Sequence, residues 1–164
     1  MNKKHTYRIS TRWTGNQGTG TNNYNSYKRE HVVQAENKIE IPGSSDPAFR
    51  GDRGRYNPEE LFVAALSACH MLWYLHLCAD AGIVVTAYED QAMGIMEEIP
   101  GGGGEFREVT LQPVVTVTHE SMIDEAKALH VKANEKCFIA NSVKFPVHHV
   151  PVCKISGRNP YKQE

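Results

Sequence analysis

The strongest structural signal in the chain is the run Asn-Pro-Glu-Glu-Leu-Phe-Val-Ala-Ala-Leu-Ser-Ala-Cys, residues 57 to 69. Asn57 is suited to cap a helix, because its side chain can accept a hydrogen bond from a backbone N–H group of the first turn. Pro58 suits the first helical position, and Glu60 can bond back to the cap. The run therefore predicts a helix that starts at Pro58 and runs to about Ala81, with Gly82 just beyond it, where glycine favours the terminating left-handed conformation.

This helix is predicted to be apolar on nearly every side, so we expect protein to enclose it. Ser67, His70 and His76 interrupt the apolar run, which favours a buried helix over a membrane span. Its length would be about 36 Å. A small protomer cannot easily cover that much apolar surface, so we expect a second subunit to help.

On both sides of this helix the sequence alternates as strands do and carries turn formers between the runs. The order of elements predicts an α+β fold, β-β-β-α-β-β-α-β, with mostly antiparallel strands around a long buried central helix. No linker is evident, so residues 1–164 are predicted to form a single domain. The expected strands cover residues 5–13, 24–34, 36–42, 83–98, 105–118 and 147–155, with Gly101 to Gly104 as a hairpin turn and a second helix from Ser121 to Lys136 or Cys137.

Composition excludes several classes of function. The 18 basic and 19 acidic residues nearly balance and form no basic stripe, so a nucleic-acid partner has no electrostatic support. Polar residues, and no apolar segment, follow the first residues, so we expect no secretory signal and a cytoplasmic location. In that reducing compartment the four cysteines are expected to be reactive, metal-binding or simply buried, and not a disulfide framework.

Two of the cysteines stand on predicted helices whose inner faces should pack together. Cys69 lies about three turns into the first helix, and Cys137 ends the second. His130 and Ala133 share the stripe of Cys137, together with Ile123 and Ala126. A small core residue is the plain alternative for each cysteine. For Cys78 and Cys153 we keep that packing role.

A metal site is the competing interpretation of the same region. Zinc needs ligands that converge on one point, and on a helix this favours spacings of three or four residues. Cys69 and His76 are about 10 Å apart along the axis, and His70 and His76 point to opposite sides. Because the chain also has no Cys-x-x-Cys pair, we expect neither a metal nor another cofactor.

The run from Asn57 to Cys69 resembles the motif of the OsmC/Ohr family, the osmotically inducible protein C and organic hydroperoxide resistance proteins. That motif reads Asn-Pro-Glu-x-Leu-Phe/Ile-x-Ala-x-x-x-Ala-Cys. The segment His130-x-x-Ala-Asn-x-x-Cys137 is similar to the second-cysteine helix of the family. Many members continue with Pro-x-Ser, whereas this chain has Phe138 to Ser142, and His70 stands where better-known members have Phe. The chain therefore resembles an OsmC-like subgroup.

The resemblance implies an intertwined homodimer that reduces organic hydroperoxides in oxidative-stress defence, with a dithiol or thiol protein as reductant. It implies that Cys69 attacks the peroxide, that Cys137 resolves the product into a disulfide, and that Glu59 orients an arginine. Arg29 and Arg50 are both candidates for that arginine, with Arg29 favoured. Glu59 and Cys69 are about 15 Å apart along one helix, so the glutamate would have to come from the other subunit.

Apolar side chains close to these residues would suit an organic hydroperoxide. The candidates are Leu61, Phe62, Leu72, Trp73 and Phe138. An alternative function uses the same surface: a non-catalytic OsmC-like module that binds a small apolar or electrophilic molecule, with cysteines that are idle or sense redox state.

Overall fold

The computed structural model describes residues 3–156 of the chain, which form two compact units divided between Phe62 and Val63. Helix α1 (Pro58–Asp80) begins in the first unit and continues into the second. The single domain expected over residues 1–164 stays a prediction.

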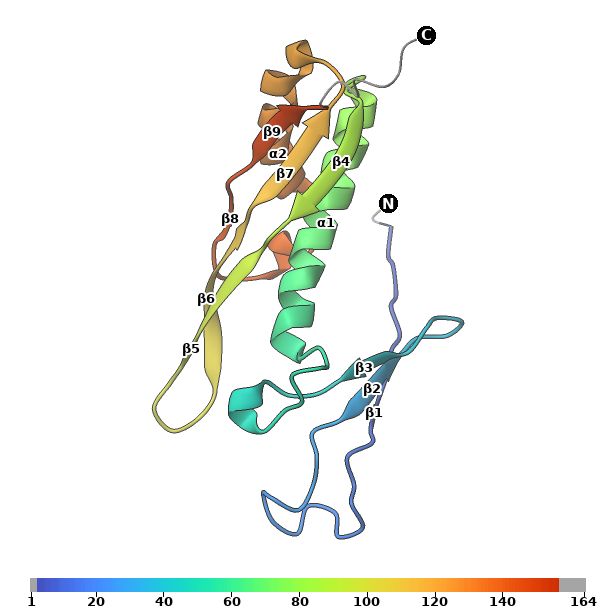
Figure 1. Cartoon of the computed structure of the whole chain (residues 1–164), viewed down its shortest axis with the longest axis vertical. Helices are drawn as coiled ribbons and strands as arrows, with labels where there is room; N and C mark the ends of the chain where they lie inside the picture. The colour runs from blue at the N-terminus through green and yellow to red at the C-terminus, as the bar shows by residue number, and fades with distance from the viewer. Residues whose placement is uncertain (1–2, 157–164) are drawn as a thin grey trace. The chain divides into compact units, whose positions relative to one another are not determined.

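The first unit contains a small antiparallel sheet in the order β1-β2-β3 (Figure 1). The strands are β1 (Ser10–Trp13), β2 (His31–Gln34) and β3 (Ile41–Gly43), and a short 3-10 helix, η1 (Pro47–Phe49), follows them. These strands are shorter than predicted, since turns occupy much of the chain between β1 and β2. There the side chain of Asn16 accepts hydrogen bonds from the backbone N–H groups of Gly18 and Gly20, at 2.9 and 3.0 Å.

Both predicted ends of α1 are confirmed. The Glu60 N–H donates to Asn57 Oδ1 at 2.7 Å, and the Asn57 N–H donates to Glu60 Oε2 at 3.0 Å, which is a reciprocal capping box. At the other end Gly82 has φ +71°, and the N–H of Ile83 donates to the Cys78 carbonyl at 2.8 Å. These bonds satisfy carbonyls that the last turn leaves without helical partners.

The single chain buries only one narrow stripe of α1. Its fully buried residues recur at every fourth position, and the side chain of Leu72 is 63% exposed. The expectation of a helix enclosed on nearly every side is therefore met on one face alone within the chain. By length and composition α1 is also the one helix among the described residues that could cross a bilayer. The stripe consists of Leu66, His70, Tyr74 and Cys78.

The second unit carries two mixed sheets, β4-β7-β9 and β5-β6-β8 (Figure 1). Each long predicted strand is broken once, and Pro113 and Pro151 stand at two of these breaks. Proline has no N–H to donate to a ladder, so it favours such interruptions. The strands are β4 (Val85–Asp90), β5 (Met93–Glu98), β6 (Gly104–Leu111), β7 (Pro113–Val117), β8 (Val147–His149) and β9 (Val152–Ile155).

Both helices of the second unit pack on one face of the sheet β4-β7-β9. Val115 and Val117 alternate with outward-facing residues of β7 and join a core cluster with Tyr74 of α1 and Leu129 of α2 (Ile123–Lys136). The short helix η2 (Glu120–Met122) precedes α2, and η3 (Ala140–Ser142) follows it. The predicted α+β class, with mostly antiparallel strands and a long central helix, is confirmed.

Candidate functional site

The structure brings Cys69 and Cys137 together inside the second unit. Cys69 lies on α1 and is half-buried, whereas Cys137 ends α2 and is 1% exposed. The Cys69 thiol lies close enough to Cys137 to help raise the pKa of the Cys137 thiol, and both thiols are free. As the sequence predicts, Cys137 stands at the end of the buried face of α2. That face includes Ala126, His130 and Ala133.

The pKa of the Cys137 thiol is raised to about 11, chiefly by burial and also by the neighbouring Cys69 thiol. Backbone contacts from Ala140 and Ile139 oppose this effect. The backbone N–H of Ala140, in η3, donates to Cys137 Sγ at 3.4 Å and favours the thiolate. The turn that replaces the family's Pro-x-Ser therefore presents a backbone donor to the sulfur of Cys137.

Cys69 opens onto an apolar pocket of about 380 Å³. Trp73 and Phe138 meet there edge to face, with ring centroids 5.5 Å apart. A thiol at the wall of an apolar pocket can meet the polar end of a molecule whose hydrocarbon part fills the rest. The lining consists of Cys69, Leu72, Trp73, His76 and Phe138.

Two polar side chains border the indole of Trp73. The ring of His76 lies 5.8 Å away in an edge-on orientation, and Lys136 Nζ lies 5.7 Å from the centre of the Trp73 ring. An ionisable imidazole therefore lines the apolar pocket, and a cation lies over the ring of its tryptophan. The sequence interpretation considered His76 only as a metal ligand and missed its place in this pocket.

Arg29 is firmly held within the first unit. Its guanidinium lies over the rings of both Tyr24 and Tyr27, 4.2 Å from each centroid. Nη1 donates to the Tyr27 carbonyl at 2.6 Å, and Nη2 donates to the Tyr24 carbonyl at 2.9 Å. Stacking and backbone hydrogen bonds together fix the direction of this cation.

Arg50 lines the same pocket as Arg29, with a volume of about 230 Å³. Its own backbone is left-handed, with φ +67°, at the end of η1. The two arginines that the sequence left as alternatives are therefore neighbours across one pocket of the first unit. Lys28, Glu30, Ser44, Gly51 and Asp52 complete its lining.

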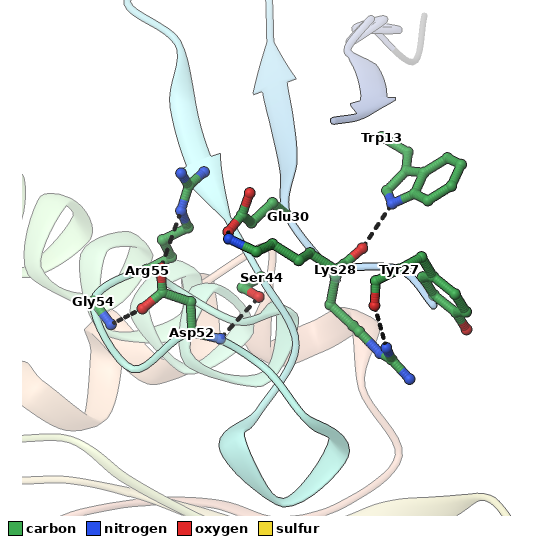
Figure 2. A network of polar contacts seen from close by, with 9 residues as sticks. Trp13, Tyr27, Lys28, Glu30, Ser44, Asp52, Gly54 and Arg55 are labelled. Carbon is green, nitrogen blue, oxygen red and sulfur yellow. Dashed lines mark hydrogen bonds and ion pairs between the residues drawn. The ribbon is translucent and has the colours of Figure 1, made fainter. Parts of the chain in front are cut away.

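Polar contacts brace the walls of this second pocket (Figure 2). The indole N–H of Trp13 donates to the Lys28 carbonyl at 2.8 Å, and Lys28 Nζ lies 3.4 Å from Glu30. The Asp52 N–H donates to Ser44 Oγ at 3.0 Å, and Arg55 Nε is 3.5 Å from the Asp52 carboxylate. Arg55 is thus engaged in a local ion pair with Asp52.

Three other predicted site residues lie on the first turns of α1, in the first unit. Glu59 is half-buried beside the helix cap, and Leu61 and Phe62 follow it, both half-buried. Their roles in orienting an arginine and in binding substrate stay predictions.

A buried histidine pair is the main feature that the sequence interpretation missed. His70 Nε2 and His130 Nδ1 lie 3.0 Å apart, and both side chains are fully buried. Burial lowers the pKa of His70 to about 4 and that of His130 to about 3. Each histidine falls on the buried stripe of its helix. The sequence placed His130 on that stripe, and the same signal on α1 could have placed His70 in the core. No group of three or more His, Cys, Asp or Glu side chains suited to hold a metal ion occurs among residues 3–156.

Comparison with known proteins gives a consistent set of similarities. A family model described as OsmC-like protein matches residues 51–150. An OsmC-like protein of unknown function from Vibrio cholerae is 30% identical, with a TM-score of 0.81, and the match covers 91% of this chain and 100% of that one. No curated protein sequence matches.

Two further solved structures share the fold. An organic hydroperoxide resistance protein from Elizabethkingia anophelis is 23% identical, with a TM-score of 0.66, and one from Legionella pneumophila is 21% identical, with a TM-score of 0.63. Both matches cover 94% of this chain and 100% of the other chain.

Proposed function

This chain belongs to the OsmC-like protein family, and from that premise we propose that it is a thiol-dependent peroxidase that reduces organic hydroperoxides. Family membership confirms the resemblance that the cysteine motifs indicated. One observation carries the proposal: the Cys69 thiol interacts with the Cys137 thiol and also lines an apolar pocket. The names of the relatives from Elizabethkingia anophelis and Legionella pneumophila agree with this substrate class.

The first step is attack of the Cys69 thiolate on the distal oxygen of the hydroperoxide. The O–O bond breaks, the alkoxide leaves and takes up a proton to become an alcohol, and Cys69 becomes a sulfenic acid. Sulfur is oxidised by two electrons and the peroxide is reduced by two.

Cys137 completes the cycle. Its sulfur attacks the sulfenic sulfur of Cys69, a disulfide forms, and the hydroxyl leaves as water with the proton that Cys137 gives up. A dithiol or a thiol protein then exchanges with this disulfide and restores both thiols. The proximity of the two sulfurs supports this step, because resolution must outrun further oxidation of Cys69.

The substrate's hydrocarbon part would occupy the pocket against Trp73 and Phe138. Both are residues for which the sequence predicts substrate binding, and Leu61 and Phe62 are proposed to extend the apolar surface. The cation that favours the Cys69 thiolate would be Arg29 or Arg50, oriented by Glu59. We place this assembly in a homodimer, since much of the apolar surface of α1 is left uncovered by its own chain.

The test is consumption of an alkyl hydroperoxide by the purified protein with a dithiol reductant. Wild-type protein should consume the hydroperoxide catalytically, and the rate with Cys69→Ser should fall to that of the uncatalysed reaction. Cys78→Ser is the matched control, because Cys78 lies on the same helix but outside the pocket lining, and it should keep wild-type turnover. Equal rates for wild type and Cys69→Ser would exclude the proposal.

A second candidate function is a binding module for a small apolar or electrophilic molecule. It is favoured by the apolar pocket together with the pKa of about 11 for Cys137, which keeps that thiol protonated near neutral pH. Intact mass after one equivalent of peroxide separates the two. A peroxidase loses two hydrogens as a Cys69–Cys137 disulfide, whereas a binding module stays reduced.

A further inference from the structure

The histidine pair joins the two helices that carry the thiols. His70 lies on α1 and His130 on α2, and one of the facing nitrogens donates a hydrogen bond while the other accepts it, at 3.0 Å. The planes of the two rings differ by only 8°. Among the described residues the remaining ring nitrogens, His70 Nδ1 and His130 Nε2, have no hydrogen-bond partner. The bond between the rings is therefore the polar contact that defines their orientation.

A second residue of α1 also contacts the His130 imidazole. The ring of Tyr74, one turn after His70, stacks on His130 with centroids 3.9 Å apart and planes 14° apart. The ring of His149, on β8, lies 5.8 Å from the ring of His70, centroid to centroid. Two consecutive turns of α1 thus hold one residue of α2, which limits both rotation and sliding of one helix against the other.

Each histidine of the pair lies close in the chain to one of the two thiols, on the same helix or at its end. Cys69 directly precedes His70 on α1, so the orientation of His70 sets the direction of the Cys69 side chain, about 100° around the axis. His130 and Cys137 are seven residues apart, which places them on the same face of α2 with a separation of about 10 Å along the axis. A change in the seating of the histidines would therefore displace one thiol relative to the other.

We propose that His70 and His130 are positioning residues that hold the Cys69 and Cys137 thiols at the separation needed to form their disulfide. The proposal rests on the proposed function for its biological meaning, since the disulfide is the product of the resolving step. It also explains the use of His at position 70, where Phe would fill the space and leave His130 without its partner.

The same idea accounts for the burial of both rings. Two neutral imidazoles can share one hydrogen bond in an apolar core, and burial lowers the pKa of each ring, so both stay neutral near pH 7. Proteins commonly locate a polar contact in the core where a single arrangement of helices must be specified. Here that arrangement is the one that faces the two sulfurs.

The test measures the disulfide equilibrium directly and needs no peroxide. The protein is equilibrated with mixtures of reduced and oxidised glutathione, where the two thiols give two electrons and two protons to glutathione disulfide and yield two glutathione molecules. The oxidised fraction is read by mass spectrometry after the remaining thiols are blocked. We expect His70→Phe to lower the equilibrium constant for the Cys69–Cys137 disulfide by about tenfold, a shift of about 30 mV toward easier reduction.

Two further variants separate positioning from general stability. His70→Gln keeps a hydrogen-bonding group near the position of Nε2, so it should recover much of the wild-type constant. Val117→Ala weakens the same core away from the histidines and should leave the constant unchanged, even where its melting temperature falls as much as that of His70→Phe.

The outcomes are distinct. A wild-type constant in His70→Phe overturns the positioning role and leaves the peroxidase proposal intact. Equal shifts in His70→Phe and Val117→Ala also overturn it, because the effect would then follow stability alone. Failure of wild-type protein to form a Cys69–Cys137 disulfide in any glutathione mixture would overturn both the positioning role and the resolving role of Cys137.

Discussion

The second unit holds two pairs of cysteines, each with one member on α1, and their surroundings differ sharply. Cys69 lines an apolar pocket, and its neighbour Cys137 accepts a hydrogen bond from the N–H of Ala140. Cys78 is 1% exposed, and Cys153 lies on β9. The pKa values of Cys78 and Cys153 are both raised, chiefly by burial, and the polar group beside them is the Tyr74 hydroxyl.

The comparison separates cysteine chemistry from cysteine content. Nine residues separate Cys69 from Cys78, which is two and a half helical turns, so the two side chains leave α1 on opposite faces. One face leads to a pocket and the other to a core of aliphatic and aromatic side chains. The first pair differs from the second because one of its thiols lines a pocket that a small molecule can enter. The second pair is packed as small apolar side chains usually are.

The largest expected effect on turnover comes from removing Cys137, and removing Cys153 from the second pair is its control. Cys137→Ser leaves the Cys69 sulfenic acid without a resolving thiol, so it should accumulate and oxidise further to sulfinic acid. We expect steady-state turnover to fall on the order of 100-fold, about 2.7 kcal/mol in activation free energy. Cys153→Ser should stay within about twofold of wild type. Turnover with an alkyl hydroperoxide and intact mass after oxidation measure both.

A different result would redraw the comparison. If Cys153→Ser slowed turnover as much as Cys137→Ser, thiols of the second pair would have to exchange with the oxidised cysteines of the first pair. Peptide mapping of the oxidised protein would then reveal a disulfide that contains Cys78 or Cys153.

The pocket provides the next largest effect. Trp73→Ala removes an apolar wall beside Cys69, so kcat/KM for a bulky aromatic hydroperoxide should fall about tenfold, whereas hydrogen peroxide should react nearly as before. Tyr74→Phe is the matched control, because the Tyr74 hydroxyl lies beside Cys78 and Cys153. This variant should react with both peroxides at the wild-type rate. An equal loss for both peroxides in Trp73→Ala would mean that the indole positions Cys69 and does not bind substrate.

Sequence reasoning reached the first pair because its signals are local. The capping box at Asn57, the glycine at position 82 and the buried stripe that ends at Cys137 all depend on residues close together in the chain. The bond between His70 and His130 depends on residues 60 positions apart, so the stripe of each helix could predict burial but not partnership. The breaks at Pro113 and Pro151 divide strands that alternation alone predicts as continuous.

The sequence could not decide between Arg29 and Arg50 for a similar reason, since their placement depends on contacts that no local pattern predicts. The direction of Arg29 is set by two backbone carbonyls and two tyrosine rings of an irregular segment, for which no periodic pattern exists. Sequence could bring both arginines to notice, but only the folded segment reveals that they share one pocket.

The third effect concerns acid stability and separates the histidines from both cysteine pairs. The pKa of His70 is lowered from 6.5 to about 4, so the folded state resists protonation that the unfolded chain accepts. The unfolding free energy should therefore be highest above about pH 6.5 and fall by about 1–3 kcal/mol as the pH drops toward 4. His70→Phe should flatten this slope, while Cys78→Ala should keep it. Urea unfolding at several pH values measures the slope, and an unchanged slope in His70→Phe would assign it to other groups.

The smallest effect tests the second pair alone. Cys78→Ala removes one buried sulfur from the core cluster with Tyr74 and Ile83, so the free energy of unfolding should fall by about 1 kcal/mol. Cys153→Ala, at a half-buried position, should cost less. Neither change should alter peroxide turnover or the glutathione equilibrium of the first pair, because packing at one face of α1 leaves the pocket at the other unchanged. A tenfold loss of turnover in Cys78→Ala, at unchanged stability, would show that the second pair takes part in the chemistry.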